Sequence, residues 1–333
     1  MTGNTGNTGN TGNTGNTGNA GISGDDGSWF VPDRADFPFS MESTATGGRI
    51  RDLHKSVHIR LDPTPGPVKK ILFTNAAGGG DPVTFADRNW AARWLAFRVL
   101  TDFTATNWNT TQLNNTLADI LIDLNTLVGT ETKQALEIKN LLAAARDERA
   151  SALGEILGQD GEFISTFMAA LAMTPASHPQ TFRVLHIASL VASFGALYYK
   201  QVFQRPRPSW ECPALMPPIP VPGHSAYPSG HATQALLMAA CMEHVLTIVT
   251  PALPQADRTA LTETIKALAR RVARNREIAG LHYPSDSAAG AALASAAFAK
   301  LSKHTGTGQS VSHYALRSFG EAVTKAAAEW KAG

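Results

Sequence analysis

From Asp81 to the C-terminus, apolar side chains recur at the spacing of an α-helix, and few segments alternate between apolar and polar residues. Asp81 followed by Pro82 is a typical helix start, because Asp caps free N–H groups and Pro suits the first helical position. Hydrophobic residues make up 43% of the chain, enough to fill a sizeable core. The pattern predicts an all-α fold, a large helical bundle in which residues 81–333 form one domain. We expect the later helices at 110–128, 131–157, 161–173, 180–203, 230–249, 255–279, 284–303 and 312–331.

The N-terminal region has a different composition. Residues 2–19 are six Thr-Gly-Asn triplets without an apolar residue, so they have nothing to bury. We therefore expect residues 1–27 to form a disordered tail. Residues 28–80 show no helical periodicity and are expected to form an irregular arm, with short extended pieces at His58–Leu61 and Lys69–Phe73.

The charge and cysteine content exclude some classes of protein. The formal net charge is only +2, so no global basic field points to a nucleic-acid partner. Charged residues make up 17%, which is low and suits much buried helix surface or the subunit interface of a homo-oligomer. The two cysteines, Cys212 and Cys241, do not make a disulfide framework, and we expect two free thiols.

No targeting or membrane segment stands out in the sequence. The N-terminus lacks the basic and then apolar regions of a Sec-type signal peptide. No stretch reaches the ~18 uninterrupted apolar residues that usually mark a spanning helix. The closest, Val184–Tyr199, contains His and Ser residues and is expected to be a buried core helix. These features predict a soluble protein without a membrane partner, either cytoplasmic or exported by another route.

The first motif that carries chemistry follows this apolar run. Lys200 stands near its end, and Arg207 follows seven positions later, between Pro206 and Pro208. Proline cannot continue a helix and disfavours helical geometry in the residue before it. Arg207 is thus expected to lie in a stiff extended segment. By itself the motif is also compatible with a surface Lys and Arg at a helix end.

The second motif, Tyr-Pro-Ser-Gly-His at 227–231, opens an apolar helix. Ser229 is well placed as the N-cap, and a helix N-terminus attracts anions through its free N–H groups. Gly230 permits close approach of the backbone to an oxygen. His231 can donate or accept a proton beside it. An ordinary capped helix would show the same residues.

The third motif places His282 six residues after Arg276 and four before Asp286. Gly280 permits a turn, and Pro284 begins the next helix, so Asp286 falls in its first turn. From there its carboxylate can bond one imidazole nitrogen of His282 and free the other as a nucleophile or metal ligand. Each feature also occurs at ordinary helix ends.

In this order the three motifs resemble the superfamily shared by vanadium haloperoxidases, bacterial acid phosphatases and lipid phosphatases. The resemblance covers about residues 197–290, and one departure is Asn275, where many members have Ser. It implies the helical bundle of that superfamily, with a catalytic domain at 81–333. It also implies a tetrahedral oxyanion held by Lys200, Arg207, Ser229, Gly230, Arg276 and His282. The negative charge of such an oxyanion suits three cations, Lys200, Arg207 and Arg276. At ~4 Å and an effective dielectric near 20, each cation–anion contact is worth roughly 4 kcal/mol before desolvation costs.

The resemblance implies two alternative chemistries for this pocket. In a haloperoxidase, vanadate is the cofactor and His282 binds its vanadium. Lys200 polarises the hydrogen peroxide, which oxidises a halide, and bromide or iodide is the expected halide. In an acid phosphatase, His282 attacks the phosphorus of a phosphate monoester and His231 protonates the leaving oxygen. Phosphate is expected to occupy the same site as vanadate.

Position 224 favours the haloperoxidase. His224 lies five positions before Ser229, where the similar algal bromoperoxidases carry a second pocket histidine, and its charge is expected to change near neutral pH. The long helical region before Lys200 and the missing signal peptide point the same way. Leu197 favours the phosphatase, because haloperoxidases often carry Trp there. A non-enzymatic oxyanion-binding protein is a third alternative, but it would need neither His231 nor Asp286.

Overall fold

The computed structural model describes residues 58–61, 71–74, 91–248, 253–305 and 311–330. Residues 29–91 cluster as one compact unit, and the helices from Ala92 onward form another. The tail predicted at 1–27 and the helix start at Asp81 lie outside the described residues.

The unit formed by residues 29–91 contains a two-stranded antiparallel ladder. Strand β1 (His58–Leu61) pairs with β2 (Ile71–Thr74), with His58 opposite Thr74 and Leu61 opposite Ile71. The first extended piece predicted from the sequence is confirmed. The second begins two residues and ends one residue later than expected, at Ile71 and Thr74.

The second unit is built almost entirely of helices, which confirms the all-α prediction. The two-residue strands β3 (Leu127–Val128) and β4 (Glu131–Thr132) form a short hairpin between helices. The helices are α3 (Ala92–Thr104), α4 (Thr111–Asp123), α5 (Lys133–Asp147), α6 (Arg149–Gly161), α7 (Ile164–Ala170), α8 (Pro179–Phe203), α9 (Pro208–Glu211), α10 (Gly230–Ile248), α11 (Gln255–Ile278), α12 (Pro284–Leu301) and α13 (Arg317–Ala327), with the 3-10 turns η4 (Pro213–Leu215) and η5 (Val311–His313).

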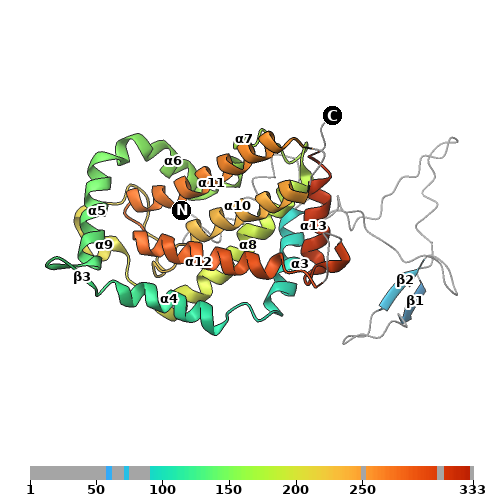
Figure 1. Ribbon diagram of the computed structural model, residues 1–333, viewed down its shortest axis with the longest axis horizontal. Coiled ribbons are helices and arrows are strands. Elements are labelled where there is room, and N and C mark those ends of the chain that lie inside the picture. Colours follow the sequence, from blue (N-terminus) through green and yellow to red (C-terminus); the bar gives the residue numbers. More distant parts are fainter. Residues whose placement is uncertain (1–57, 62–70, 75–90, 249–252, 306–310, 331–333) are drawn as a thin grey trace. The chain divides into compact units, whose positions relative to one another are not determined.

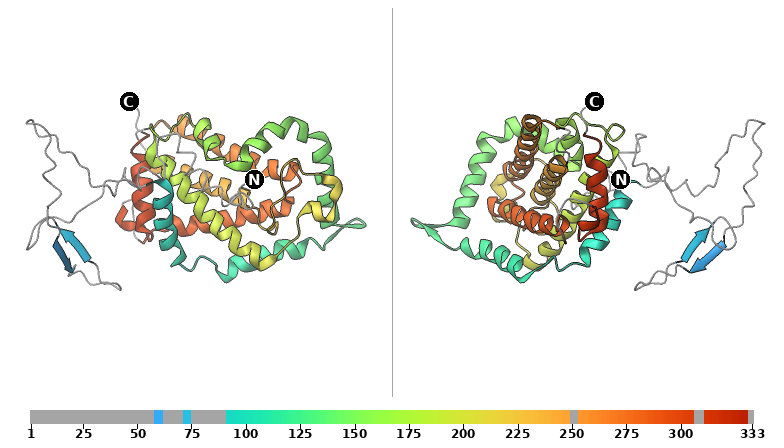
Figure 2. Two further views of the ribbon diagram at one scale, coloured as in Figure 1. Left: turned by 180° about the vertical axis from the view of Figure 1, so that it is seen from behind. Right: turned by 45° about the vertical axis from the view of Figure 1, so that its right-hand side comes forward.

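The core of this unit lies around α8 and α10. Helix α10 packs against α8, α11 and α12, while α3 and α13 pack against α8. In Figures 1 and 2, α3 and α13 lie at one end of the helical unit, and α5, α6 and α9 lie at the other. Both central helices are apolar on most faces, as expected of helices surrounded by others.

Helix α8 carries the apolar run noted in the sequence, and its burial confirms the predicted core helix. Among the described residues, one helical stretch, Pro179–Glu211, is long and apolar enough to cross a membrane, and 78% of its most apolar window is buried inside the protein. Helix α8 ends where Gln204 adopts a left-handed backbone (φ 48°), two residues before Pro206. Lys200 therefore lies in its last turn, as expected.

The single helix expected at 131–157 is wrong, because the chain forms two helices, α5 and α6, that meet at Glu148. Distant segments hold this corner. The Arg149 guanidinium donates to the carbonyls of Leu215 (2.8 Å) and Ile278 (3.0 Å), and Arg274 donates to the Glu148 carboxylate (2.6 Å). The spacing of apolar residues within one segment does not reveal contacts with distant segments. The helices expected at 161–173 and 312–331 are also shorter than predicted.

Candidate active site

The predicted anion-binding residues meet at the ends of four helices. The last turn of α8 and the segment after it carry Lys200 and Arg207, the start of α10 carries Ser229, and the α11–α12 connection carries His282. These segments are hydrogen-bonded to one another: the Arg207 guanidinium donates to the carbonyl of Leu281 at 2.9 Å. The candidate site residues that are buried are Lys200, Arg207, Ser229, Gly230, His231, Arg276, His282 and Asp286.

The start of α10 is fixed against α12. The Ser229 hydroxyl accepts from the backbone N–H of Ala232 at 3.3 Å, which confirms the predicted N-cap, and the Ser229 N–H donates to the Asp286 carbonyl at 2.9 Å. A Cβ on Gly290 would lie 3.0 Å from the Ser229 carbonyl oxygen and 3.0 Å from the Ala232 side chain. A side chain at position 290 would therefore require α12 and the helix start to move apart slightly, whereas glycine permits this close approach.

Two buried cations lack a carboxylate partner among the residues that the structure describes. Lys200 Nζ donates to the carbonyls of Ser225 (2.9 Å) and Ala226 (2.7 Å). The Arg207 guanidinium donates to carbonyls and imidazoles. Burial lowers the pKa of Arg207 to about 10, and burial together with Arg207 lowers the pKa of Lys200 well below its usual value. Since a buried cation without a counter-charge is costly, this arrangement suits a bound anion.

The third cation is arranged differently. Arg276 lies in the last turn of α11, and its guanidinium donates to the Asp160 carboxylate on α6 at 3.0 Å. Burial lowers its pKa, and Asp160 opposes that shift. Arg276 thus bonds to a carboxylate, whereas Lys200 bonds to backbone carbonyls and Arg207 to backbone carbonyls and imidazoles.

His282 is hydrogen-bonded at both ring nitrogens. Nδ1 lies 3.2 Å from Asp286 Oδ2, as predicted, and Nε2 lies 3.1 Å from Arg207 Nη1. A guanidinium only donates, so Nε2 carries the lone pair and Nδ1 carries the proton. Burial and the surrounding cations lower the pKa of His282 well below its usual value. The neutral ring therefore presents Nε2 as the atom able to act as nucleophile or ligand.

His231 is oriented by α6. Its Nε2 lies 3.1 Å from the backbone carbonyl of Gln159, and its ring stacks on Phe163 with centroids 5.0 Å apart. A carbonyl only accepts, so Nε2 carries the proton and Nδ1 is the atom that gains or loses one. Asn275 donates to the Gln159 side chain at 2.9 Å and thereby ties α11 to this contact. The position where many relatives carry Ser thus has a structural role here.

Asp286 is held by residues that the sequence did not single out. The Arg205 guanidinium donates to Asp286 Oδ1 (2.7 Å) and to Glu137 on α5 (3.1 Å), and it lies 3.6 Å from the centre of the Tyr283 ring. Glu137 also accepts from the backbone N–H and the hydroxyl of Ser285. Burial raises the pKa of Asp286, and Arg205 opposes that rise. Arg205 therefore favours the charged carboxylate that orients His282.

His224 contacts Arg207 at the edge of the same cluster. Its Nδ1 lies 3.0 Å from Arg207 Nη2 and 3.0 Å from the Ser225 carbonyl. The guanidinium only donates and favours a lone pair on Nδ1, whereas the Ser225 carbonyl only accepts and favours a proton there, so these two contacts favour opposite tautomers. The His224 Nε2 is buried and has no hydrogen-bond partner within the described part of the chain.

The expected charge change of His224 near neutral pH is not found in this site. Burial, with Lys200 as the next cause, lowers the pKa of His224 to about 4. The imidazole is therefore neutral throughout the physiological range while the cationic pocket holds no anion. A bound anion would oppose the field of Lys200 and raise that pKa.

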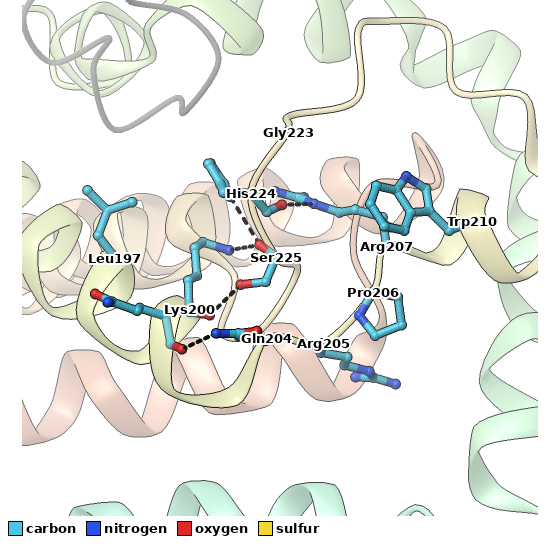
Figure 3. Close-up of a pocket in the computed structure, with 11 residues that line it drawn as sticks. Leu197, Lys200, Gln204, Arg205, Pro206, Arg207, Trp210, Gly223, His224 and Ser225 are labelled. Carbon is cyan, nitrogen blue, oxygen red and sulfur yellow. Dashed lines mark hydrogen bonds between the residues drawn. The ribbon is translucent and has the colours of Figure 1, made fainter.

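A pocket of about 390 Å³ opens beside these residues. Figure 3 shows Leu197 and Trp210 on opposite sides of it, with His224 and Ser225 between them. Its lining residues are Leu197, Lys200, Gln201, Gln204, Arg205, Pro206, Arg207, Trp210, Gly223, His224 and Ser225. The pocket thus reaches two of the predicted anion ligands, Lys200 and Arg207, while Ser229, His231 and His282 are not among its lining residues.

Comparison with known families agrees with this arrangement. Residues 182–308 match the PAP2 superfamily and form a domain of that superfamily, which includes acid phosphatases and haloperoxidases. No curated protein matches the chain at a significant level. The match includes all the predicted anion-binding and catalytic residues, whereas Glu137, Gln159 and Asp160 precede it. It supports activity of the phosphatase or haloperoxidase type in general.

Proposed function

We propose that this chain is a vanadate-dependent haloperoxidase, which oxidises bromide or iodide with hydrogen peroxide to hypohalous acid. The observation that carries the proposal is the position of His224. It lines the pocket beside Lys200 and contacts Arg207, as expected of the second pocket histidine of similar bromoperoxidases. Its Nε2 is buried and has no hydrogen-bond partner among the described residues, so it is available to a substrate or bound anion.

The residues present fit an oxyanion cofactor. Lys200 and Arg207 are buried cations with no carboxylate partner among the described residues, and the Nε2 lone pair of His282 faces Arg207. When bound, vanadate supplies a Lewis acid that activates hydrogen peroxide at neutral pH. The residues that would hold it are Lys200, Arg207, Ser229, Gly230, Arg276 and His282, with His282 Nε2 as the vanadium ligand.

The other side chains have separate roles in this proposal. Asp286 keeps the proton on Nδ1 of His282 and so keeps Nε2 available. Lys200 supplies positive charge that polarises the peroxide. His231 exchanges a proton at Nδ1 while the Gln159 carbonyl holds its Nε2–H.

An acid phosphatase is the second candidate, and Leu197 favours it. This residue lines the pocket where many haloperoxidases carry Trp. In this alternative His282 Nε2 attacks the phosphorus of a phosphate monoester, and the phosphohistidine is hydrolysed by water. His231 protonates the leaving oxygen. One purified sample, assayed with vanadate, peroxide and bromide and separately with p-nitrophenyl phosphate, discriminates between the two functions.

We expect His224→Ala to lower bromide oxidation about tenfold or more, because it removes an imidazole nitrogen that is available to the reacting oxygens in this proposal. Since a bound anion raises the pKa of His224 from about 4, the acidic limb of the pH profile should also change. The measurement is steady-state bromide oxidation from pH 5 to 8, with vanadate occupancy followed in parallel. His178→Ala, at the far end of α8, is the matched control. Unchanged kinetics would reduce His224 to a loop residue and favour the phosphatase.

We expect phosphate and vanadate to compete for one site, with an affinity that falls as pH rises. Burial lowers the pKa of Lys200, and a bound anion raises it, so binding takes up a proton. Lys200→Arg should flatten the pH dependence, because guanidinium keeps its charge at alkaline pH. Calorimetric titration of vanadate with and without saturating phosphate, between pH 6 and 9, measures both effects. Vanadate binding that is insensitive to phosphate would contradict the shared pocket.

A further inference from the structure

The pocket beside the buried cations Lys200 and Arg207 is also lined by apolar side chains that have no role in binding an inorganic anion. Leu197 is 43% exposed and Trp210 is 69% exposed, although both are large apolar side chains. They lie on opposite sides of the opening in Figure 3. An inorganic anion and a halide need only the cationic end of this space. The apolar walls therefore indicate a second, organic component of the reaction.

Trp210 stands on a fixed base. It lies on the short helix α9, whose first residue is Pro208, and its backbone N–H donates to the Arg207 carbonyl at 2.9 Å. The next residue, Glu211, accepts a hydrogen bond from Gln134 on α5 at 3.0 Å. The indole is therefore carried by the same segment that carries Arg207, so its distance from the anion-binding end is constrained. A planar ring at this place is suited to stacking.

Two further lining residues carry polar amide groups. Gln201 and Gln204, from the end of α8, are exposed and also line the pocket. Their amide oxygens can accept a hydrogen bond from a hydroxyl. At about 390 Å³ the space is at the lower end of the range for small-molecule sites, which suits a single ring rather than a long chain.

We propose that this pocket binds a single-ring aromatic substrate of the phenol type, with its ring on Trp210, its edge toward Leu197 and its hydroxyl toward the Gln201 and Gln204 amides. The inference rests on the proposed haloperoxidase function, for which it names the organic acceptor. Hypohalous acid formed at the cationic end meets the ring there. A ring carbon bonds to the halogen as the halogen–oxygen bond breaks, and the displaced ring proton joins the hydroxide to give water.

The binding test uses phenylphosphonate and methylphosphonate, whose anionic groups both suit the cation cluster. Calorimetry on the full chain should show phenylphosphonate binding about tenfold tighter, and Trp210→Ala should remove most of that preference. Trp94→Ala on α3, also an exposed tryptophan, is the matched control and should keep the preference. Equal binding of the two phosphonates by the wild type, or an unchanged preference in Trp210→Ala, would overturn the aromatic site alone. Failure of both phosphonates and of inorganic phosphate to bind would overturn the anion site, and with it both proposals.

A kinetic test uses phenol as the acceptor with vanadate, peroxide and bromide. Bromophenol formation should saturate with phenol in the wild type, and the half-saturating phenol concentration should rise about tenfold in Trp210→Ala. Leu197→Ala should raise the half-saturating phenol concentration less, because leucine is smaller than tryptophan and its truncation removes less contact area with the ring. A rate of ring bromination that is linear in phenol, or a half-saturating concentration unaffected by Trp210→Ala, would show that the hypohalous acid reacts in solution and would overturn the proposal.

Discussion

Replacing His282 with alanine is expected to reduce turnover by about a thousandfold or more, whether the enzyme is assayed as a haloperoxidase or as a phosphatase. The substitution removes Nε2, the atom that faces Arg207 and would bond to vanadium or phosphorus. It also leaves Asp286 without the imidazole that it orients. Vanadate should bind more weakly as well, because only the cations and the helix start remain to hold it.

The measurement needs a check that the variant is folded. Circular dichroism and the melting temperature should show a folded protein, since Arg207 still donates to the Leu281 carbonyl and Asp286 still pairs with Arg205. His178→Ala serves as the matched imidazole deletion, at the end of α8 away from Lys200, and should retain activity. Turnover close to that of the wild type in His282→Ala would contradict the whole site assignment.

The anion-facing residues could be predicted because each belongs to a motif with its own local geometry. Arg207 follows a helix that proline must end, Ser229 caps an apolar helix, and Asp286 falls four residues after His282, within reach of its ring. These relations depend on residues close in sequence. The structure brings the three motifs together, while the roles given to their residues stay predictions.

The supporting residues could not be predicted for the opposite reason. Gln159 contacts His231 across 72 positions, and Glu137 contacts Ser285 across 148 positions, so neither lies near a motif. Glu137 lies on α5 and Gln159 lies on α6. The spacing of apolar residues predicted one helix across this region, because it does not reveal the corner at Glu148. Arg205 was visible in the sequence beside Arg207. Only the tertiary structure shows that Arg205 faces Asp286, whereas Arg207 faces His282.

Because Arg205 bridges Asp286 and Glu137, Arg205→Gln is expected to destabilise the protein and to slow catalysis. Removing one partner of a buried ion pair costs about 3–5 kcal/mol, and the Arg205 and Asp286 side chains are only 7% and 0% exposed. Without Arg205, burial alone sets the pKa of Asp286 and raises it further. A protonated Asp286 no longer fixes the tautomer of His282, so turnover should fall about 10–100-fold.

The sign of the pH dependence distinguishes this mechanism from a general loss of packing. A carboxyl whose folded pKa is raised contributes its stability below the unfolded pKa and loses it as pH rises through the folded pKa. The stability deficit of Arg205→Gln relative to the wild type should therefore be larger at pH 7 than at pH 4. The acidic limb of the activity profile should move to higher pH, because Asp286 must be charged to orient His282.

Denaturant unfolding at pH 4 and pH 7, with steady-state kinetics from pH 5 to 8, measures both effects. Arg205→Lys should restore part of the activity, since it keeps the charge but cannot bond Asp286, Ser285 and Glu137 with one planar group. Arg317→Gln removes an ion pair with Glu321 in which the arginine is 80% exposed, and it should change little. A stability deficit that is the same at both pH values, with kcat unchanged, would show that Arg205 only packs against Tyr283 and does not keep Asp286 charged.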